Sequence, residues 1–302
     1  MNEQLKKYID KWSLHNGILT SFDVDLRIFT YFGIGGKADV FFCPTNLLQV
    51  QKCIELCTIH HINPKILGKG SNLLITKSQI PIVIYTKELC SYTINKNTIT
   101  AQSGVSLPII VRKAISSGLS LEKLTGIPGT LGGAVYGNSG TKWNNQLYAI
   151  GDYVEEIVAV SFDDASITKL SRADLHFKYR KSNLQSRFIF EVKLRISQGT
   201  PHKLIDSWKK FARKKSTSQP YKYKSAGCIF RNPPHIEAWK LIRQAKLCEF
   251  SAGDIVISSQ HANFIVNKGN GSAKEVLEVI SNIQKRIYEE FGLHLVLEIQ
   301  IW

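Results

Sequence analysis

The sequence has no apolar run close to the roughly 20 residues that a helix needs to cross a bilayer. Its first residues, MNEQLKKYIDKW, also lack the apolar core of a secretory signal peptide. Both absences argue against membrane insertion and export, so we expect a cytoplasmic protein.

Cysteines are few and scattered, and we expect reduced thiols rather than a disulfide framework. The six stand at Cys43, Cys53, Cys57, Cys90, Cys228 and Cys248. Cys53 and Cys57 precede His60 and His61, which could suggest a zinc cluster. A second pair of ligands at metal spacing is missing, however, and the simpler interpretation is an amphipathic helix with both cysteines on its buried side. We therefore expect no metal.

Acidic residues are scarce. The chain has 24 Asp and Glu against 39 Lys and Arg, a net charge of +15. Such a balance favours an anionic partner, either a nucleotide substrate or a nucleic acid. No zinc-finger spacing, RNP motif or basic heptad is present, so we do not expect nucleic acid as the main partner.

The chain has 302 residues, of which 43% are apolar, enough for two domains with substantial cores. Helical and strand patterns are mixed along it. A helix should begin at Asn46, another should fill 106–119 and stop near Gly118, and an amphipathic one should fill 273–291 and end at Gly292. Residues 294–302 should form a strand. A change in composition near residues 199–201 places a domain boundary between 1–198 and 199–302.

The stretch 125–140, TGIPGTLGGAVYGNSG, holds six glycines and no charged residue. Consecutive backbone N–H groups in such a loop can converge on an anion, and its apolar residues indicate packed backbone. A tight turn or flexible tip has a similar composition, so phosphate binding stays one of two interpretations. Neither a Walker loop nor the Rossmann spacing is present. A second turn, GKGSN at 68–72, lies between two predicted strands and could contribute N–H groups.

Seven stretches in order resemble one family, the UDP-N-acetylenolpyruvoylglucosamine reductases (MurB). They are FGIGGKADV, LGKGSNLLI, GIPGTLGGAVYGNSG, YRKS, SAGCIFRNP, HANFIVN and LEIQIW. The resemblance covers nearly the whole chain from about residue 30. The short link between YRKS and RFIF is similar to the family's compact second type.

The resemblance implies an α+β fold: a two-subdomain FAD-binding region of the p-cresol methylhydroxylase and vanillyl-alcohol oxidase type, followed by a smaller α+β substrate domain. The anion at the glycine loops would then be the FAD pyrophosphate. By match to the family's motifs, the residues expected at the cofactor are Gly68, Gly70, Ser71, Asn72, Leu73, Gly126, Ile127, Pro128, Gly129, Gly132, Gly133, Ala134 and Asn138.

The implied reaction reduces the flavin with NADPH and passes hydride to the vinyl carbon of UDP-N-acetylglucosamine enolpyruvate, giving UDP-N-acetylmuramate for peptidoglycan. Charge develops on the neighbouring carbon and its carboxylate and must be stabilised. By match to the motifs, Arg180 supplies a permanent cation and Glu298, in protonated form, polarises the enolate. Taken alone, Arg180 could be a surface ion-pair partner, and Glu298 an ordinary outward residue of its strand.

Cys228 departs from the family pattern, which commonly has Ser at this place as the proton donor. A thiol can do the same work, because an unperturbed cysteine, with a pKa of about 8.5, is largely protonated at pH 7. We predict that Cys228 protonates the carbanion; the alternative is a small buried apolar residue.

Asn232 and His261 match substrate contacts, although His261 could equally be a structural histidine bonded to backbone. The expected partners are a UDP-sugar and NADPH, with no nucleic acid and no membrane insertion, and we expect a monomer. Two rivals are another flavoenzyme of the same cofactor fold and a basic nucleic-acid-binding protein without flavin.

Overall fold

The computed structural model describes residues 1–144 and 146–302. The chain forms two compact units. The first comprises Met1–Val24, Ala38–Gly68 and Ile80–Arg213, and the second Asp25–Lys37, Lys69–Gln79 and Lys214–Trp302. These ranges differ from a division at 198/199, because the C-terminal unit includes two short segments from the N-terminal part of the chain. The functional division into 1–198 and 199–302 stays a prediction.

The first unit begins with a four-stranded sheet in the order β1-β2-β5-β3, in which β3 runs parallel to β5. Its elements are α1 (Glu3–His15), β1 (Leu19–Asp25), β2 (Lys37–Cys43), α2 (Leu47–Ile59), β3 (Lys65–Leu67) and β5 (Gln79–Tyr85). Helix α2 begins as predicted, because the Asn46 side chain accepts the Gln49 N–H at 3.0 Å. Cys53 and Cys57 lie fully buried on its inner face, as expected.

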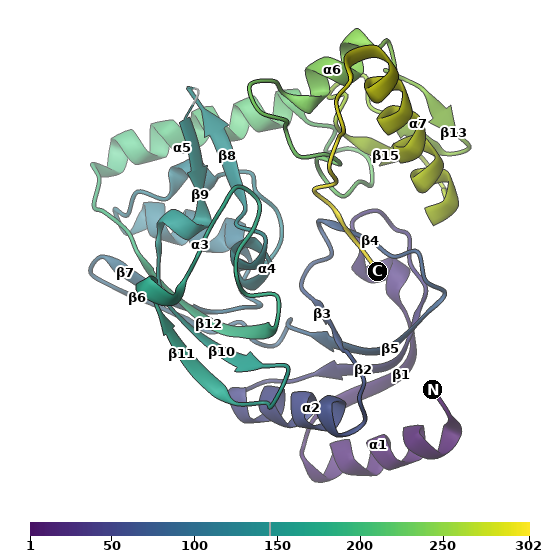
Figure 1. Cartoon of the computed structure of the whole chain (residues 1–302). Coiled ribbons are helices and arrows are strands. Elements are labelled where there is room, and N and C mark those ends of the chain that lie inside the picture. Colours follow the sequence, from purple (N-terminus) through teal and green to yellow (C-terminus); the bar gives the residue numbers. More distant parts are fainter. Residues whose placement is uncertain (145) are drawn as a thin grey trace. The chain divides into compact units, whose positions relative to one another are not determined.

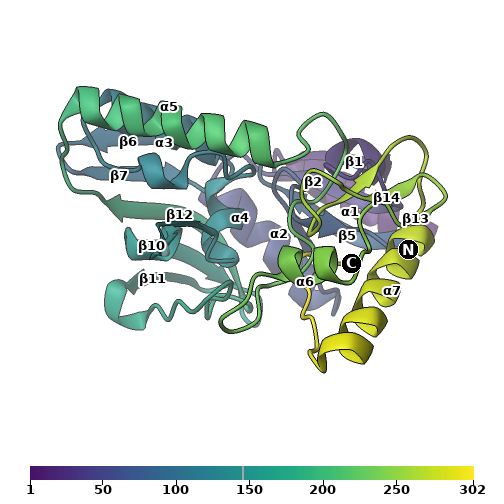
Figure 2. The same cartoon turned by 90° about the horizontal axis from the view of Figure 1, so that it is seen from above.

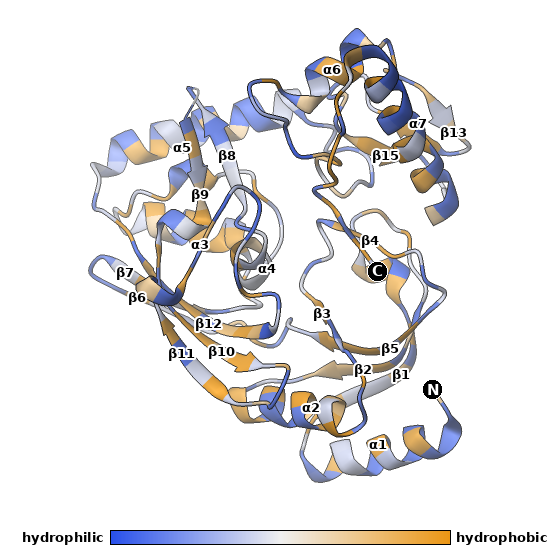
Figure 3. Cartoon of the chain, viewed as in Figure 1, coloured by the Kyte–Doolittle hydropathy of each residue, from blue (hydrophilic) through white to orange (hydrophobic). Residues whose placement is uncertain are grey.

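A five-stranded antiparallel sheet in the order β11-β10-β12-β7-β6 forms the rest of this unit (Figure 1). Its strands are β6 (Tyr92–Asn95), β7 (Thr98–Gln102), β10 (Val154–Ser161), β11 (Ile167–Ser171) and β12 (Arg187–Arg195). The helices in this part of the chain are α3 (Leu107–Ser116), α4 (Leu131–Tyr136) and α5 (Pro201–Ser218). Strands β10 and β12 are mainly hydrophobic (Figure 3), because helices cover them. Helices α3 and α4 share one apolar cluster with β7 and β12, whereas α2 shares another with residues of β10 and β12.

Short elements connect these layers. They are the 3₁₀ turns η2 (Glu122–Leu124), η3 (Ile150–Asp152) and η4 (Arg172–Asp174), and the paired strands β8 (Gly140–Trp143) and β9 (Gln146–Ala149). A further 3₁₀ turn, η1 (Leu26–Phe29), belongs to the second unit. Helix α3 stops as predicted, with Gly118 at a φ of 74° two residues after its last turn. The chain passes from the first unit to the second within α5, between Arg213 and Lys214.

The second unit contains a three-stranded antiparallel sheet, β13-β14-β15, with α7 packed across β13 and β14 (Figure 2). Its elements are β4 (Leu73–Leu74), α6 (Ala238–Gln244), β13 (Ser251–Ala252), β14 (Ile255–Ile257), β15 (Ile265–Asn267), α7 (Ala273–Phe291) and β16 (Gln300–Ile301). Helix α7 was predicted correctly at both ends. A capping box joins Ser272 to Glu275, and Gly292 ends the helix with a φ of 67°.

One prediction from the pattern was wrong, and one strand was not predicted. The expected C-terminal strand over 294–302 is reduced to β16, because the chain changes partner: Leu297 pairs with Phe230, and Gln300–Ile301 then pairs in parallel with β4. Strand β1 was missed. It lies at the edge of its sheet, so only alternate side chains are partly covered and the apolar pattern is weak.

No helix in residues 1–144 and 146–302 combines the length and apolar character required for a membrane span.

Candidate active site

The expected catalytic residues divide between the units, with Arg180 in the first and Cys228 and Glu298 in the second. In the second unit, residues 228–231 lie between two other segments. Cys228 pairs with Phe264 on one side, and on the other the Glu298 N–H donates to the Ile229 carbonyl at 2.7 Å. The structure therefore brings the backbones at Cys228 and Glu298 together, although they are 70 positions apart in the chain. Both side chains are half-buried.

Asn72, at the end of the GKGSN turn, is hydrogen-bonded to the segment that contains Glu298. Asn72 donates from Nδ2 to the Glu298 carbonyl at 3.1 Å, and its own carbonyl accepts the Gln300 N–H at 2.9 Å. Gly70 has a φ of 60°, and a Cβ at this position would collide with the Phe29 carbonyl oxygen. Only glycine fits at this position. Ser71 and Leu73 directly follow this closely packed turn.

Asn232 has a structural hydrogen bond of its own. Its Oδ1 accepts the Ala238 N–H at 3.0 Å, at the first turn of α6. This bond orients the amide beside the start of α6.

His261 lies among aromatic rings, with Phe264 edge-on at 4.8 Å and Trp239 at 6.3 Å between ring centroids. Burial lowers the pKa of its imidazole to about 4, and Lys215 adds to the effect. The ring is therefore neutral at pH 7. Within the described residues its Nδ1 is buried without a hydrogen-bond partner. A hydrogen bond to the backbone of His261 itself opposes the lowering of the pKa, so a structural histidine bonded to backbone stays an alternative.

The glycine loop of the first unit is packed backbone, and its middle forms the short helix α4. Thr130 caps this helix by accepting the Gly133 N–H at 3.3 Å, and a Cβ on Gly68 would lie 2.6 Å from the Thr130 hydroxyl. Two expected cofactor segments, Gly68 and 126–134, are thus in direct contact. Thr130 therefore both caps α4 and contacts Gly68.

Further glycines shape this loop. Gly126 and Gly129 have φ values of 78° and 103°, a region that disfavours other residues. Gly132 is buried against Ser103, which accepts its N–H at 2.9 Å. Gly133 is exposed, and a Cβ there would have only Thr130 Oγ1 within 4 Å.

These features fit a dinucleotide cofactor. Backbone lines the loop, no acidic side chain lies in 125–140, and Gly133 leaves an open approach for a ligand. Ile127 and Pro128, partly and fully exposed, add apolar surface beside it.

Arg180 occupies a tight turn in which Lys178 and Lys181 exchange two backbone hydrogen bonds. Its φ of 55° is unfavourable for a side chain with a Cβ and costs on the order of 1 kcal/mol or more. Its guanidinium donates from Nη2 to the Gly140 carbonyl at 2.9 Å. This contact ties the arginine to the end of the glycine loop.

Asn138 holds the same turn. Its Nδ2 donates to the Lys178 carbonyl at 2.8 Å, and its Oδ1 accepts the Gly151 N–H at 3.0 Å. Sequence patterns suggested a cofactor contact for Asn138, and its side chain is engaged within the protein, where it supports the position of Arg180.

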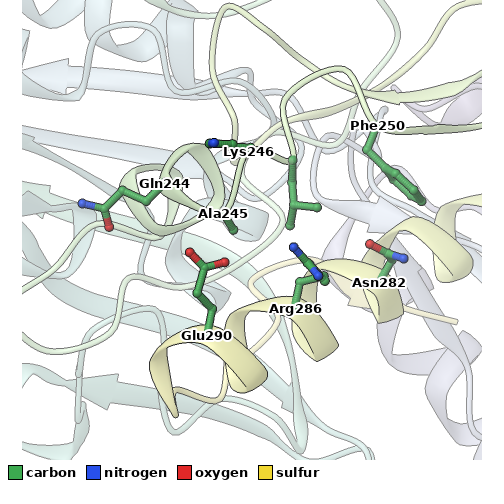
Figure 4. Close-up of a pocket in the computed structure, with 8 residues that line it drawn as sticks. Gln244, Ala245, Lys246, Phe250, Asn282, Arg286 and Glu290 are labelled. Carbon is green, nitrogen blue, oxygen red and sulfur yellow. The ribbon is translucent and has the colours of Figure 1, made fainter.

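The second unit has a pocket between helix α7 and the segment after α6. Figure 4 shows Arg286 and Glu290 projecting from α7 toward the segment that carries Gln244 and Lys246. None of the expected site residues lines it. The described residues contain no group of three or more His, Cys, Asp or Glu side chains that could hold a metal ion.

Comparison with known proteins gives two matching family models. One, described as UDP-N-acetylenolpyruvoylglucosamine reductase, C-terminal domain, matches residues 219–302, and the other, described as FAD binding domain, matches residues 38–171. A reductase of the first name from Clostridium perfringens is 31% identical over 305 residues, covering 100% of this chain and 99% of its own length. The chain belongs to the UDP-N-acetylenolpyruvoylglucosamine reductase family.

Other relatives agree with this assignment. The reductase of Caldicellulosiruptor saccharolyticus is 35% identical over 284 residues, 92% of this chain and 90% of its own length. The crystal structure of MurB from Thermus caldophilus matches 94% of this chain and 98% of its own, with 31% identity and a TM-score of 0.79. The family resemblance, the α+β fold with an FAD-binding region and the assignment as an oxidoreductase that uses FAD are therefore confirmed.

Proposed function

We propose that this chain catalyses the NADPH-driven, FAD-dependent reduction of UDP-N-acetylglucosamine enolpyruvate to UDP-N-acetylmuramate, a step of peptidoglycan synthesis. The observation that carries the proposal is the assembly of Cys228 and Glu298 on neighbouring backbones, bonded through Ile229, inside a chain of this family. A nicotinamide donor and a nucleotide sugar are cytoplasmic metabolites, which favours that location.

We propose that the N-terminal part of the chain binds the cofactor and the C-terminal part binds the substrate. We assign cofactor binding to 1–198 and substrate binding to 199–302, since the FAD-binding model (38–171) and the reductase C-terminal model (219–302) fall within these ranges. When bound, FAD supplies a two-electron carrier that takes hydride from NADPH and delivers it to the vinyl carbon of the substrate. The loop at 126–134 and Gly68 would hold its pyrophosphate.

The protein's side chains handle the charge and the proton. Arg180 binds the substrate carboxylate, whose negative charge grows as the vinyl carbon is reduced. Glu298, as the protonated acid, would donate a hydrogen bond to the same developing enolate. The Cys228 thiol then gives its proton to the neighbouring carbon, becomes a thiolate, and is reprotonated from solvent.

Asn232 and His261 are the proposed substrate contacts. His261 is neutral at pH 7 because burial lowers its pKa to about 4. It therefore serves as a hydrogen-bonding group and not as a counter-ion for the diphosphate.

The test is Cys228→Ala in anaerobic half-reactions followed by the visible absorbance of the flavin. Bleaching by NADPH should keep its wild-type rate, whereas recovery of colour with the enolpyruvyl nucleotide should slow by on the order of 10²- to 10⁴-fold, the usual contribution of a general acid. Cys228→Ser should retain appreciable activity, because a hydroxyl can also donate a proton.

The matched control is Cys248→Ala, which removes another half-buried thiol of the same unit and should leave both half-reactions unchanged. Unchanged recovery in Cys228→Ala would refute the donor assignment. A wild-type protein whose colour recovers only with oxygen would point instead to an oxidase. A colourless protein that takes up no FAD and binds nucleic acid in a salt-dependent way would support the other rival.

A further inference from the structure

The segment that carries Cys228 is held in place by hydrogen bonds from the side chain of Asn263. Asn263 Oδ1 accepts the Phe230 N–H at 2.9 Å, and Asn263 Nδ2 donates to the Phe230 carbonyl at 2.8 Å. The Asn263 backbone carbonyl also accepts the Ile229 N–H at 2.9 Å. Three hydrogen bonds therefore join one residue to the two positions that directly follow Cys228.

The opposite edge of this segment is held by ordinary backbone. Glu298 donates to the Ile229 carbonyl at 2.7 Å, and Arg231 donates to the Val296 carbonyl at 2.8 Å. Residues 228–231 thus lie between two other segments, with backbone hydrogen bonds to Val296 and Glu298 on one side. On the other side the Asn263 amide supplies the donor and acceptor that a neighbouring backbone would supply.

Asn263 and Phe230 are both buried, so loss of the hydrogen bonds between them would be costly. Asn263 is 3% exposed and Phe230 is 1% exposed. If the amide were removed, the Phe230 N–H and carbonyl would lose their partners away from water. An unpaired buried polar group is costly, so the segment would move until both groups found new partners. Cys228 is two residues from Phe230 and would move with it.

A proton donor tolerates little movement, because it must lie within hydrogen-bond reach of the carbon it protonates. We propose that Asn263 is a positioning residue, which fixes the Cys228 thiol in its proton-donating place by pairing both polar backbone groups of Phe230. The proposal rests on the donor role of Cys228 in the proposed function. Asn263 itself donates no proton to substrate.

The test compares Asn263→Ala with Asn267→Ala. Asn267 is also 3% exposed, lies in the same HANFIVN stretch, and its amide is likewise fully used, donating to the Phe32 carbonyl at 3.0 Å and accepting from Gly269 and Gly271. Removing it disturbs a similar buried amide without touching residues 228–231. In Asn263→Ala, flavin reduction by NADPH should stay within about twofold of wild type, whereas reoxidation by the enolpyruvyl nucleotide should slow at least tenfold. Asn267→Ala should keep both rates, whatever its loss of stability.

A double-mutant cycle with Cys228→Ala separates positioning from general damage. If Asn263 acts through the thiol, Asn263→Ala should slow reoxidation by less than twofold when Cys228 is already alanine. Should Asn263→Ala fail to fold, Asn263→Leu serves in both measurements, because it nearly keeps the side-chain volume and has neither the donor nor the acceptor for Phe230.

Three outcomes would overturn the proposal: unchanged reoxidation in the Asn263 variant, equal slowing in Asn267→Ala, or multiplicative effects in the cycle. Its failure is distinguishable from failure of the proposed function. If Cys228→Ala alone reoxidises normally, the donor assignment is at fault. If Cys228→Ala is slow and the Asn263 variant is not, only the positioning role is lost.

Discussion

At the scale of single residues, His261 should make the protein sensitive to acid. Its pKa is lowered to about 4 by burial, against an ordinary value of 6.5. Between these values the unfolded chain binds a proton that the folded protein does not, so the free energy of unfolding falls as the pH drops from about 6.5 to 4. The full shift would correspond to about 3 kcal/mol at most. Urea unfolding of the apoprotein at pH 7, 5.5 and 4.5 measures it.

The control is His261→Gln, which does not titrate. Several carboxylates, including Asp25 and Glu155, have a lowered pKa because they accept hydrogen bonds from Arg27 and Arg195. Their protonation in acid also lowers the free energy of unfolding. Their contribution is common to both proteins, so the difference between the two pH profiles belongs to His261. Parallel profiles would contradict the assignment.

The sequence offers candidates for reactive side chains more readily than it shows which groups hold them in place. Arg180, Cys228 and Glu298 stand inside recognisable motifs, whereas the bonds of Asn138 to Lys178 and of Asn263 to Phe230 span 40 and 33 residues. An asparagine in a motif offers one donor and one acceptor site without indicating where they point. Its partner depends on chain pairing that no local pattern contains.

At the scale of elements, the two glycines that open helix α4 should respond in opposite ways to alanine. A Cβ on Gly132 would lie 2.5 Å from the Ser103 Cβ, so Gly132→Ala should destabilise the apoprotein by roughly 1–3 kcal/mol. Gly133 is exposed in the same turn, where alanine normally favours a helix by about 0.5–1 kcal/mol. Gly133→Ala should therefore keep or raise stability yet weaken FAD binding, because its methyl group occupies the open approach.

Urea unfolding of the two apoproteins and FAD titration by flavin fluorescence give both quantities. Equal stabilities would contradict the packing argument. Unchanged FAD affinity in Gly133→Ala would remove this residue from the cofactor site.

Elements with local signals were predicted well, and elements that depend on distant partners were not. Helix α7 has its start in Ser272 and Glu275 and its end in Gly292, all within its own sequence. The C-terminal segment has an equally strong alternating pattern. The strand that forms, β16, is shorter because the segment pairs first with Phe230 and then with β4. Both partners lie far away in the chain, so the local pattern contains no information about them. Within the glycine loop, α4 is too short for a helical repeat to be visible.

At the scale of the whole molecule, the composition of the second unit could not be predicted from the order of the chain. Its core contains Phe32, Ile34 and Leu74, all at most 5% exposed. Asn267 donates to the Phe32 carbonyl, and β4 is the partner of β16. The change in composition near residue 199 gives no sign that two N-terminal segments complete this core, and the chain passes from the first unit to the second only within α5, between Arg213 and Lys214.

A fragment of residues 199–302 should therefore fail to fold cooperatively on its own. Burial of one large apolar side chain contributes about 1.5–3 kcal/mol, so the loss of Phe32, Ile34 and Leu74 removes roughly 5–9 kcal/mol. That is comparable with the whole stability of a small domain, about 5–15 kcal/mol. Denaturant titration followed by circular dichroism should give a broad, non-cooperative change. A version that joins 25–37 and 69–79 to 214–302 through flexible linkers restores both the apolar residues and the partner of β16, and it should unfold in a single sharp transition. A sharp transition in the 199–302 fragment alone would show that the N-terminal segments are not needed for this core.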